Sequence, residues 1–118
     1  AGMQGFEDPL NRGTFPWGSE DESLLAFFRR LGQLRAERIS MQCGIIRYLH
    51  AQGGGLVVER LHGTERTVTA LNAGDTPLEL TLPWDGRLCI DAVTGQQFLS
   101  QNGTVRLTLP PLDGVILV

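Results

Sequence analysis

The chain has 118 residues, of which 42% are hydrophobic and 19% charged, and its formal net charge is -3 at neutral pH. This length predicts one modest hydrophobic core, and the weak negative charge excludes the basic surface that binds nucleic acid or an anionic membrane. No apolar run reaches the about 18 residues of a membrane span, and no basic segment with an apolar stretch behind it opens the sequence. We therefore expect no nucleic-acid partner and no membrane partner. We expect a cytoplasmic location, with secretion as the alternative if the sequence is a fragment of a longer protein.

The first stretch, residues 2–17, has the composition of a shaped loop and reads GMQGFEDPLNRGTFPW. Pro9 and Pro16 restrict the backbone, and there is almost no aliphatic periodicity. Asp8 and Arg12 stand four residues apart among aromatic side chains. A carboxylate and a guanidinium hydrogen-bond sugar hydroxyls, and aromatic rings cover the apolar faces of a sugar. The same spacing also fits an Asp8–Arg12 ion pair that only holds the loop together, and spacing alone does not separate these two interpretations.

This stretch resembles the segment after the eighth barrel strand in the alpha-amylase family of glycoside hydrolases, most closely in its neopullulanase and cyclomaltodextrinase branch. The matched positions are Gly2, Met3, Gly5, Asp8, Pro9, Asn11, Arg12, Phe15, Pro16 and Trp17. The resemblance continues to the end of the chain, where LPPLDGVILV at residues 109–118 is similar to the end of the family's C-terminal domain. It implies that Asp8 and Arg12 bind substrate on the donor side of the cleaved bond.

The resemblance also implies a division of the chain. Residues 1–38 would be the tail of a catalytic (β/α)8 barrel, and residues 39–118 a C-terminal β-sandwich that supports it. The catalytic carboxylates of such a retaining hydrolase lie earlier in the family's sequence, so the chain alone is predicted to be inactive. The parent protein would act on α-glucans or cyclic maltodextrins, and the resemblance implies neither a cofactor nor a metal.

Residues 19–38 have the pattern of one amphipathic helix, with apolar side chains at i, i+3, i+4, i+7 and i+10. Ser19 and Glu22 have the spacing of a capping box at its start. The apolar stripe consists of Leu24, Phe27, Phe28, Leu31 and Leu34. In the family this helix packs on the outside of the barrel. Without a barrel, we expect the stripe to fold back on the sandwich or to form a homodimer through Leu24, Phe27, Phe28 and Leu31.

From residue 39 onward, short β-branched or alternating runs between turn residues predict an all-β fold, an antiparallel, Greek-key-like β-sandwich of about eight strands. The predicted strands are 44–49, 56–61, 66–72, 78–82, 87–91, 97–99, 104–109 and 115–118. Two runs alternate clearly, and they place Leu78, Leu80, Leu82, Val105, Leu107 and Leu109 in the core. Asn102-Gly103 and Asp85-Gly86 are the strongest hairpin signals.

The remaining polar and sulfur-containing residues favour structural roles. Cys43 and Cys89 lack the spacing of a metal or redox site and are predicted to be buried free thiols, with a disulfide as the alternative. Asp91 and Asp113 occupy turns, where carboxylates accept backbone N–H groups.

The same sequence also allows a different class of protein, a free-standing carbohydrate-binding or interaction β-sandwich without catalysis. Its ligand surface would lie on the sandwich, around an exposed Trp84 on which a sugar ring stacks. A packed Trp84 at the edge of the core is the alternative, and it fits the C-terminal part of a hydrolase equally well.

Overall fold

The computed structural model describes residues 5, 7 and 13–118, in two compact units, Ala1–Gln33 and Leu34–Val118. The predicted substrate-binding residues, Asp8 and Arg12, lie outside the described residues. Helix α1, Glu22–Glu37, begins in the first unit and ends in the second. The unit boundary therefore falls inside a helix, and the predicted division between residues 38 and 39 stays a prediction.

Helix α1 confirms the predicted amphipathic helix, but the predicted capping box is wrong. Asp21 caps the helix instead, because its Oδ1 accepts the backbone N–H of Leu24 at 3.0 Å and the hydroxyl of Ser23 at 2.7 Å. The Leu24 N–H bond, followed by the Ser23 hydroxyl, lowers the pKa of Asp21. Neither helix of the described residues is both long and apolar enough to cross a membrane.

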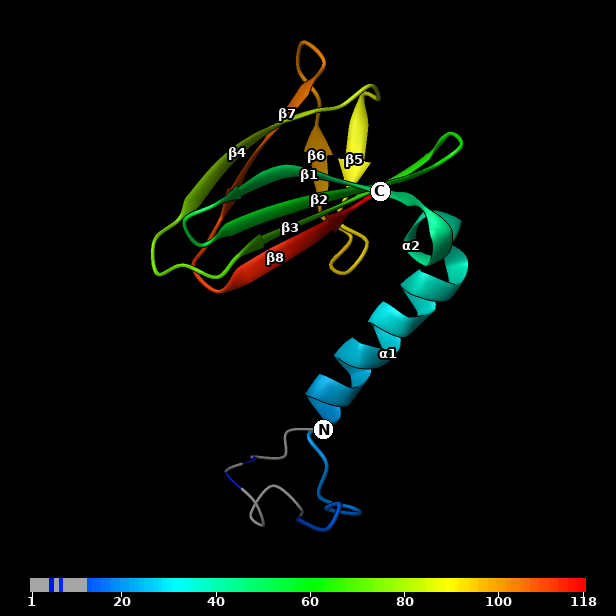
Figure 1. Ribbon diagram of the computed structural model, residues 1–118, viewed down its shortest axis with the longest axis vertical. Helices are drawn as coiled ribbons and strands as arrows, with labels where there is room; N and C mark the ends of the chain where they lie inside the picture. The colour runs from blue at the N-terminus through cyan, green and yellow to red at the C-terminus, as the bar shows by residue number, and fades with distance from the viewer. Residues whose placement is uncertain (1–4, 6, 8–12) are drawn as a thin grey trace. The chain divides into compact units, whose positions relative to one another are not determined.

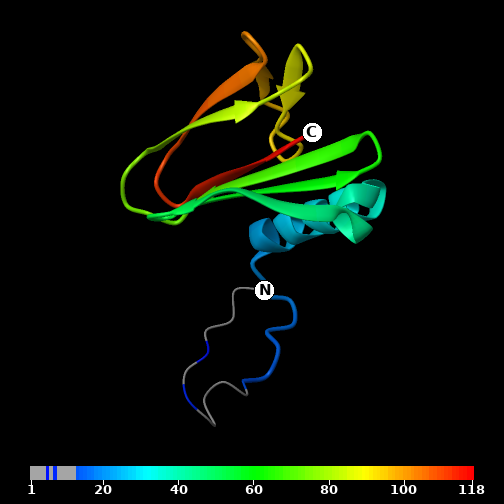
Figure 2. The ribbon, with the colours of Figure 1, turned by 45° about the horizontal axis from the view of Figure 1, so that its top comes forward.

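The second unit is the predicted antiparallel all-β structure, preceded by a short helix α2, Ile39–Cys43. One sheet has four strands in the order β1-β2-β3-β8, which are Ile45–Gln52, Gly55–His62, Glu65–Asn72 and Asp113–Leu117. A second sheet pairs β4, Leu78–Pro83, with β7, Thr104–Leu109. A third pairs β5, Leu88–Ile90, with β6, Gln97–Leu99. Figure 1 shows β1, β2, β3 and β8 side by side, and Figure 2 shows β4 and β7 as a layer facing them.

The core lies between these two layers, because alternate residues of each strand point inward. Leu80, Leu82, Val105, Leu107 and Leu109 are buried as predicted, and Leu78 is half-buried against the same cluster. The four-stranded sheet contributes Val57, Val68, Ala70 and Leu117. The alternation seen in the sequence thus identified one wall of the core correctly.

The two strongest turn signals have different outcomes. Asn102 and Gly103 both have positive φ, 53° and 73°, and they close a tight turn between the paired residues Gln101 and Thr104, as predicted. The predicted Asp85-Gly86 hairpin is wrong, because this turn joins β4 to β5, which pair with β7 and β6 and not with each other. A turn signal reports a change of direction, and it does not report which strands pair.

The cysteine prediction is correct for one of the two thiols. Both cysteines are free, and Cys89 is fully buried on β5, where burial raises the pKa of its thiol. Cys43 ends helix α2 and is exposed, so the predicted burial of its thiol is wrong. The chain leaves the helix only at Gly44, and Cys43 therefore never enters the sheet.

Candidate functional site

The described part of the N-terminal loop presents aromatic side chains. The rings of Phe15 and Trp17 contact each other with centroids 4.7 Å apart, and Trp17 is 85% exposed. Backbone bonds from Trp17 to Phe15 and from Ser19 to Pro16 form a tight turn around Pro16. A shaped aromatic loop was predicted, and residues 13–19 have that form. An exposed tryptophan in such a loop has the chemistry of a ligand or partner contact.

A second candidate is the outer face of the four-stranded sheet. Strand pairing places Tyr48 beside Val58, and Leu56 beside Leu71, on the face opposite the core. Tyr48 is 70% exposed and Leu71 is 44% exposed, while Val58 and Leu56 are half-buried. We call this cluster of Tyr48, Leu56, Val58 and Leu71 the outer apolar face. Adjacent exposed apolar side chains of this kind mark a surface that contacts another body.

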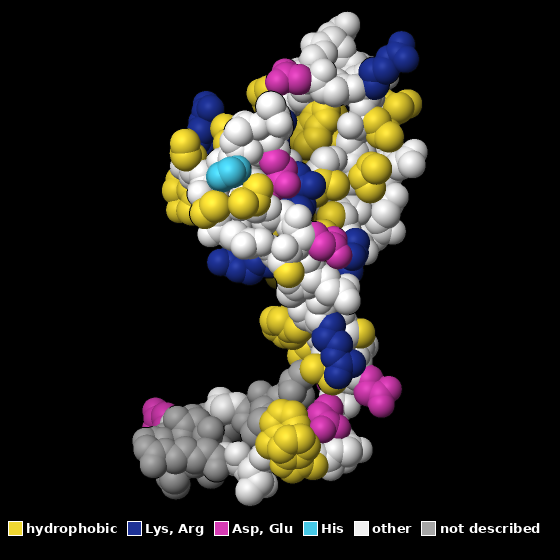
Figure 3. Space-filling view, turned by 90° about the vertical axis from the view of Figure 1, so that its right-hand side faces the viewer, with side chains coloured by type: hydrophobic (Ala, Val, Ile, Leu, Met, Phe, Trp, Pro, Cys, Tyr) yellow, Lys and Arg dark blue, Asp and Glu magenta, His cyan; other side chains and the backbone are white. Residues whose placement is uncertain are grey.

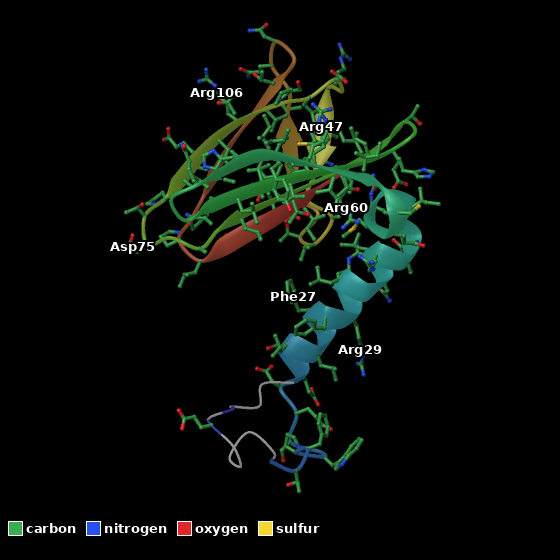
Figure 4. All side chains as sticks on the ribbon, in the orientation of Figure 1. Phe27, Arg29, Arg47, Arg60, Asp75 and Arg106 are labelled. Atoms are coloured by element: carbon green, nitrogen blue, oxygen red, sulfur yellow. The ribbon has the colours of Figure 1, made fainter. Side chains whose placement is uncertain are left out.

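Helix α2 covers the neighbouring end of the same face through a polar junction. Arg38 Nε donates to Thr67 Oγ1 at 2.7 Å, the Ser40 hydroxyl bonds the same Thr67 oxygen at 2.8 Å, and Arg60 Nε donates to the Ser40 carbonyl at 3.0 Å. Thr67 is only 1% exposed as a result, although it shares its face with Tyr48. These bonds fix the end of the helical segment on strands β2 and β3. Arg60, which reaches helix α2 from β2, is labelled in Figure 4.

Glu65 completes this junction and makes it dependent on pH. Its Oε1 accepts the Ser40 N–H at 2.7 Å, and this contact with Ser40 lowers the pKa of Glu65 below its usual value of 4.5. A lowered carboxyl pKa adds stability above the unfolded-state pKa and loses it as the pH falls through the folded-state pKa. We expect Glu65→Gln to lower the melting temperature at pH 6, with the difference from wild type shrinking toward pH 3.

The matched control is Glu79→Gln, since Glu79 is an exposed glutamate on strand β4. Its melting temperature should follow wild type at every pH in scanning calorimetry. A Glu65→Gln variant with the same offset from wild type at pH 3 as at pH 6 would contradict a stabilising role for this carboxylate.

A cluster of charges lies at one end of the sandwich. Glu59 is buried, and its Oε2 accepts Arg66 Nε at 2.6 Å, while its Oε1 lies 3.6 Å from Arg47 Nε. The Arg66 guanidinium also sits 4.7 Å from the centre of the Trp84 ring and donates to the Pro83 carbonyl at 2.9 Å. Sequence reasoning missed this cluster, although Glu59 stands two residues after Val57, in phase with the core positions of its strand. An acidic residue at a position that the alternation assigns to the core was the signal in the sequence for a buried ion pair.

Trp84 is packed and is not a platform for a sugar ring. It is 7% exposed, its Nε1 donates to the Leu88 carbonyl at 3.2 Å, and Arg66 covers its ring. This removes the sequence feature on which a free-standing sugar-binding module depended. Within the described residues no group of three or more acidic, histidine or cysteine side chains is arranged to hold a metal ion.

Comparisons with known proteins connect the chain to longer enzymes. No protein-family model matches it. An amylopullulanase from Thermoanaerobacter thermohydrosulfuricus is 30% identical over 133 residues, which covers all of this chain and 9% of that protein. A cyclomaltodextrinase from Geobacillus thermopakistaniensis is 26% identical over 121 residues, covering 98% of this chain and 21% of that protein. The chain therefore spans about a tenth to a fifth of the length of these relatives.

Solved structures agree with the fold. The crystal structure of an Anoxybacillus alpha-amylase matches with a TM-score of 0.88 and 26% identity, over 98% of this chain and 26% of that one. A structure described as a cyclomaltodextrinase matches with a TM-score of 0.84 over 99% of this chain, at 19% identity. In each case a larger protein contains a region with the fold of this chain.

Proposed function

We propose a supporting, non-catalytic function for this chain, which corresponds to the C-terminal region of the alpha-amylase family. The parent protein would be a retaining glycoside hydrolase acting on α-glucans or cyclic maltodextrins. In it, the sandwich would stabilise the catalytic barrel, and the N-terminal loop would line donor-side sugar subsites through Asp8 and Arg12. A cytoplasmic location remains a prediction.

The observation that carries this proposal is the outer apolar face. Tyr48 and Leu71 remain exposed on one sheet face while the other face forms a complete core. The relatives are about five to eleven times longer than this chain, and a protein of their kind would supply a barrel to cover this face. A barrel seated on this face would remove Tyr48 from water, and burying a side chain of this size stabilises by about 2 kcal/mol.

A chimera tests the proposal. The matching region of the Geobacillus thermopakistaniensis cyclomaltodextrinase is replaced by this chain, and cyclodextrin hydrolysis is compared with that of the enzyme truncated before the region. We expect the chimera to hydrolyse cyclodextrin and the truncated enzyme to lose activity, while the 118-residue chain alone releases no sugar. A chimera no more active and no more heat-resistant than the truncated enzyme would overturn the proposal.

Substitutions in the chimera separate the outer apolar face from general effects on folding. Tyr48→Asp should lower its inactivation temperature, because the charge enters the proposed interface with the barrel. Leu99→Asp is the matched control, since Leu99 is 73% exposed on β6, in a different sheet. Equal losses from both substitutions would contradict an interface at the outer apolar face.

We also propose that the isolated chain forms a homodimer through the apolar stripe of helix α1. Phe27 and Phe28 are 44% and 58% exposed, and Figure 3 shows hydrophobic side chains along one side of the helix and charged ones along another. We expect the isolated chain to dimerise, and Phe28→Glu to weaken the dimer at least about tenfold, because burying one such side chain contributes about 1.5–3 kcal/mol.

Sedimentation equilibrium over a range of concentrations measures this dimer. Arg29→Glu is the control, since Arg29 neighbours Phe28, is exposed and lies outside the stripe. A wild-type chain that stays monomeric at every concentration, or an equal effect of Arg29→Glu, would remove the homodimer from the proposal.

A further inference from the structure

Leu112 has a backbone conformation that its own side chain disfavours. It lies in the turn between β7 and β8, and its φ is 56°. In this left-handed region the Cβ of most residues comes too close to the following carbonyl oxygen, so glycine and asparagine are favoured there. The other non-glycine residue with positive φ in the described part of the chain is Asn102. A leucine therefore strains the backbone at a position where an asparagine or a glycine would not.

The surrounding fold imposes this strain. Asn72 is 4% exposed, and its Nδ2 donates to the carbonyls of Leu109 at 3.1 Å and Pro110 at 3.0 Å. Just after the turn, Asp113 pairs with the same Asn72 in the four-stranded sheet. Figure 1 shows β7 and β8 joined at one end of the sandwich. One buried residue thus holds both sides of the turn, and a strained residue persists where its surroundings fix the backbone in this way.

The Leu112 side chain gains little from the rest of the chain. It is 82% exposed, so most of its apolar surface stays in water. Leu99 is similarly exposed, at 73%, but it does not have a positive φ. A single exposed leucine is ordinary on a protein surface, whereas backbone strain gathers at sites that bind another molecule. The combination of strain and exposure indicates that Leu112 contacts a body outside this chain.

The turn leads directly into the outer apolar face. Gly114, two residues after Leu112, pairs with Leu71, which belongs to that face. A Cβ at Gly114 would lie 2.6 Å from Leu71 Cδ2, so glycine here leaves room for the leucine side chain. Leu71 remains 44% exposed beside it. A body that covers the outer apolar face therefore reaches the turn that carries Leu112.

We propose that Leu112 is an anchor for the catalytic barrel, against which its side chain packs at the edge of the outer apolar face. This rests on the proposed function, which seats the barrel on that face, and it adds the residue that holds the edge of the contact. The relatives are long enough to contain such a barrel. A few buried apolar anchors carry most of the energy of an interface, and a side chain on a rigid turn loses little freedom when it is buried.

Leu112→Asn tests the anchor, because it should act in opposite directions in the isolated chain and in the Geobacillus thermopakistaniensis chimera. In the isolated chain, asparagine relieves the strain and removes no buried surface. The ratio of unfolded to folded chain in urea should therefore fall about fivefold. In the chimera, the same substitution removes a contact with the barrel. The temperature at which half of the cyclodextrin hydrolysis is lost should therefore fall by about 2 °C or more.

Two further variants control this experiment. Leu112→Gly also removes the strain and the side chain, and it should destabilise the chimera as Leu112→Asn does. Leu99→Asn makes the same chemical change at an exposed leucine in a different sheet, without positive φ, and it should leave the chimera unchanged. Equal effects of Leu99→Asn and Leu112→Asn on the chimera would overturn the proposal.

Each remaining outcome decides one step of the inference. An isolated chain that Leu112→Asn does not stabilise would overturn the strain on which the proposal depends. A Leu112→Asn chimera as heat-resistant as the unsubstituted chimera would overturn the anchor. Weaker self-association of the isolated Leu112→Asn chain in sedimentation equilibrium would assign the leucine to a second copy and overturn the contact with the barrel.

These outcomes differ from a failure of the proposed function. An active, heat-resistant chimera that Leu112→Asn leaves unchanged would remove only the anchor. A chimera no better than the truncated enzyme would remove the supporting role, and the anchor with it.

Discussion

Replacing Asp91 by alanine is expected to lower the free energy of unfolding by about 4 kcal/mol, because several donors lose one buried acceptor together. Asp91 is 1% exposed. Its Oδ1 accepts the N–H groups of Val93 and Ile116, each at 3.1 Å, and its Oδ2 accepts the Thr94 hydroxyl at 2.5 Å. The carboxylate thus ties the turn after β5 to the last strand, β8. A loss of this size is a large part of the 5–15 kcal/mol of a typical domain.

Urea unfolding followed by tryptophan fluorescence measures this effect, and two variants control it. Asp113→Ala should cost no more than about 0.5 kcal/mol, because Asp113 is exposed and bonds only the N–H of the adjacent Gly114 among the described residues. Asp91→Asn should fall between wild type and Asp91→Ala, since its Oδ1 still accepts both N–H groups. An Asp91→Ala variant as stable as Asp113→Ala would contradict the stabilising role of the Asp91 carboxylate.

Replacing Glu59 by alanine is expected to cost about 3 kcal/mol, because it leaves the Arg66 guanidinium without its carboxylate in a largely buried position. The Glu59 side chain is 7% exposed and that of Arg66 is 21% exposed. The expected cost comes mainly from the remaining charge, and the ion pair by itself contributes little. The double variant Glu59→Leu with Arg66→Met should therefore recover much of the stability lost in Glu59→Ala.

The matched control for this experiment is Glu79→Ala, which removes an exposed glutamate from β4 and should change stability by less than about 0.5 kcal/mol. The same urea titration compares all variants. A double variant less stable than Glu59→Ala would show that the ion pair itself is stabilising, and it would refute the attribution of the cost to the unpaired Arg66 charge.

Local patterns predicted most of the secondary structure. Leu78, Leu80 and Leu82 alternate with polar residues, so they share one face of a strand. Once a second sheet covers that face, these three leucines are the side chains that become buried. Helix α1 begins three residues later than predicted, at Glu22. Ser19, Asp21 and Glu22 all have side chains that can cap a helix, and only the backbone geometry selects Asp21. Asp8 and Arg12 rest on the motif alone and stay predictions.

The sequence by itself determined helix α1 and the strands, the leucines and valines of one side of the core, and the resemblance to the C-terminal region of the alpha-amylase family, because these depend on residues close together in the chain. It did not predict the short helix α2, Ile39–Cys43. Only the tertiary structure decided which side chains distant in the sequence contact each other. Arg38 and Thr67 are 29 residues apart in the sequence and form a hydrogen bond. Asp91 accepts the N–H of Ile116, which lies 25 residues further along the chain. Such contacts depend on strand order and register. Periodicity assigns each residue to a face, and only the pairing of β1, β2, β3 and β8 determines its neighbours there.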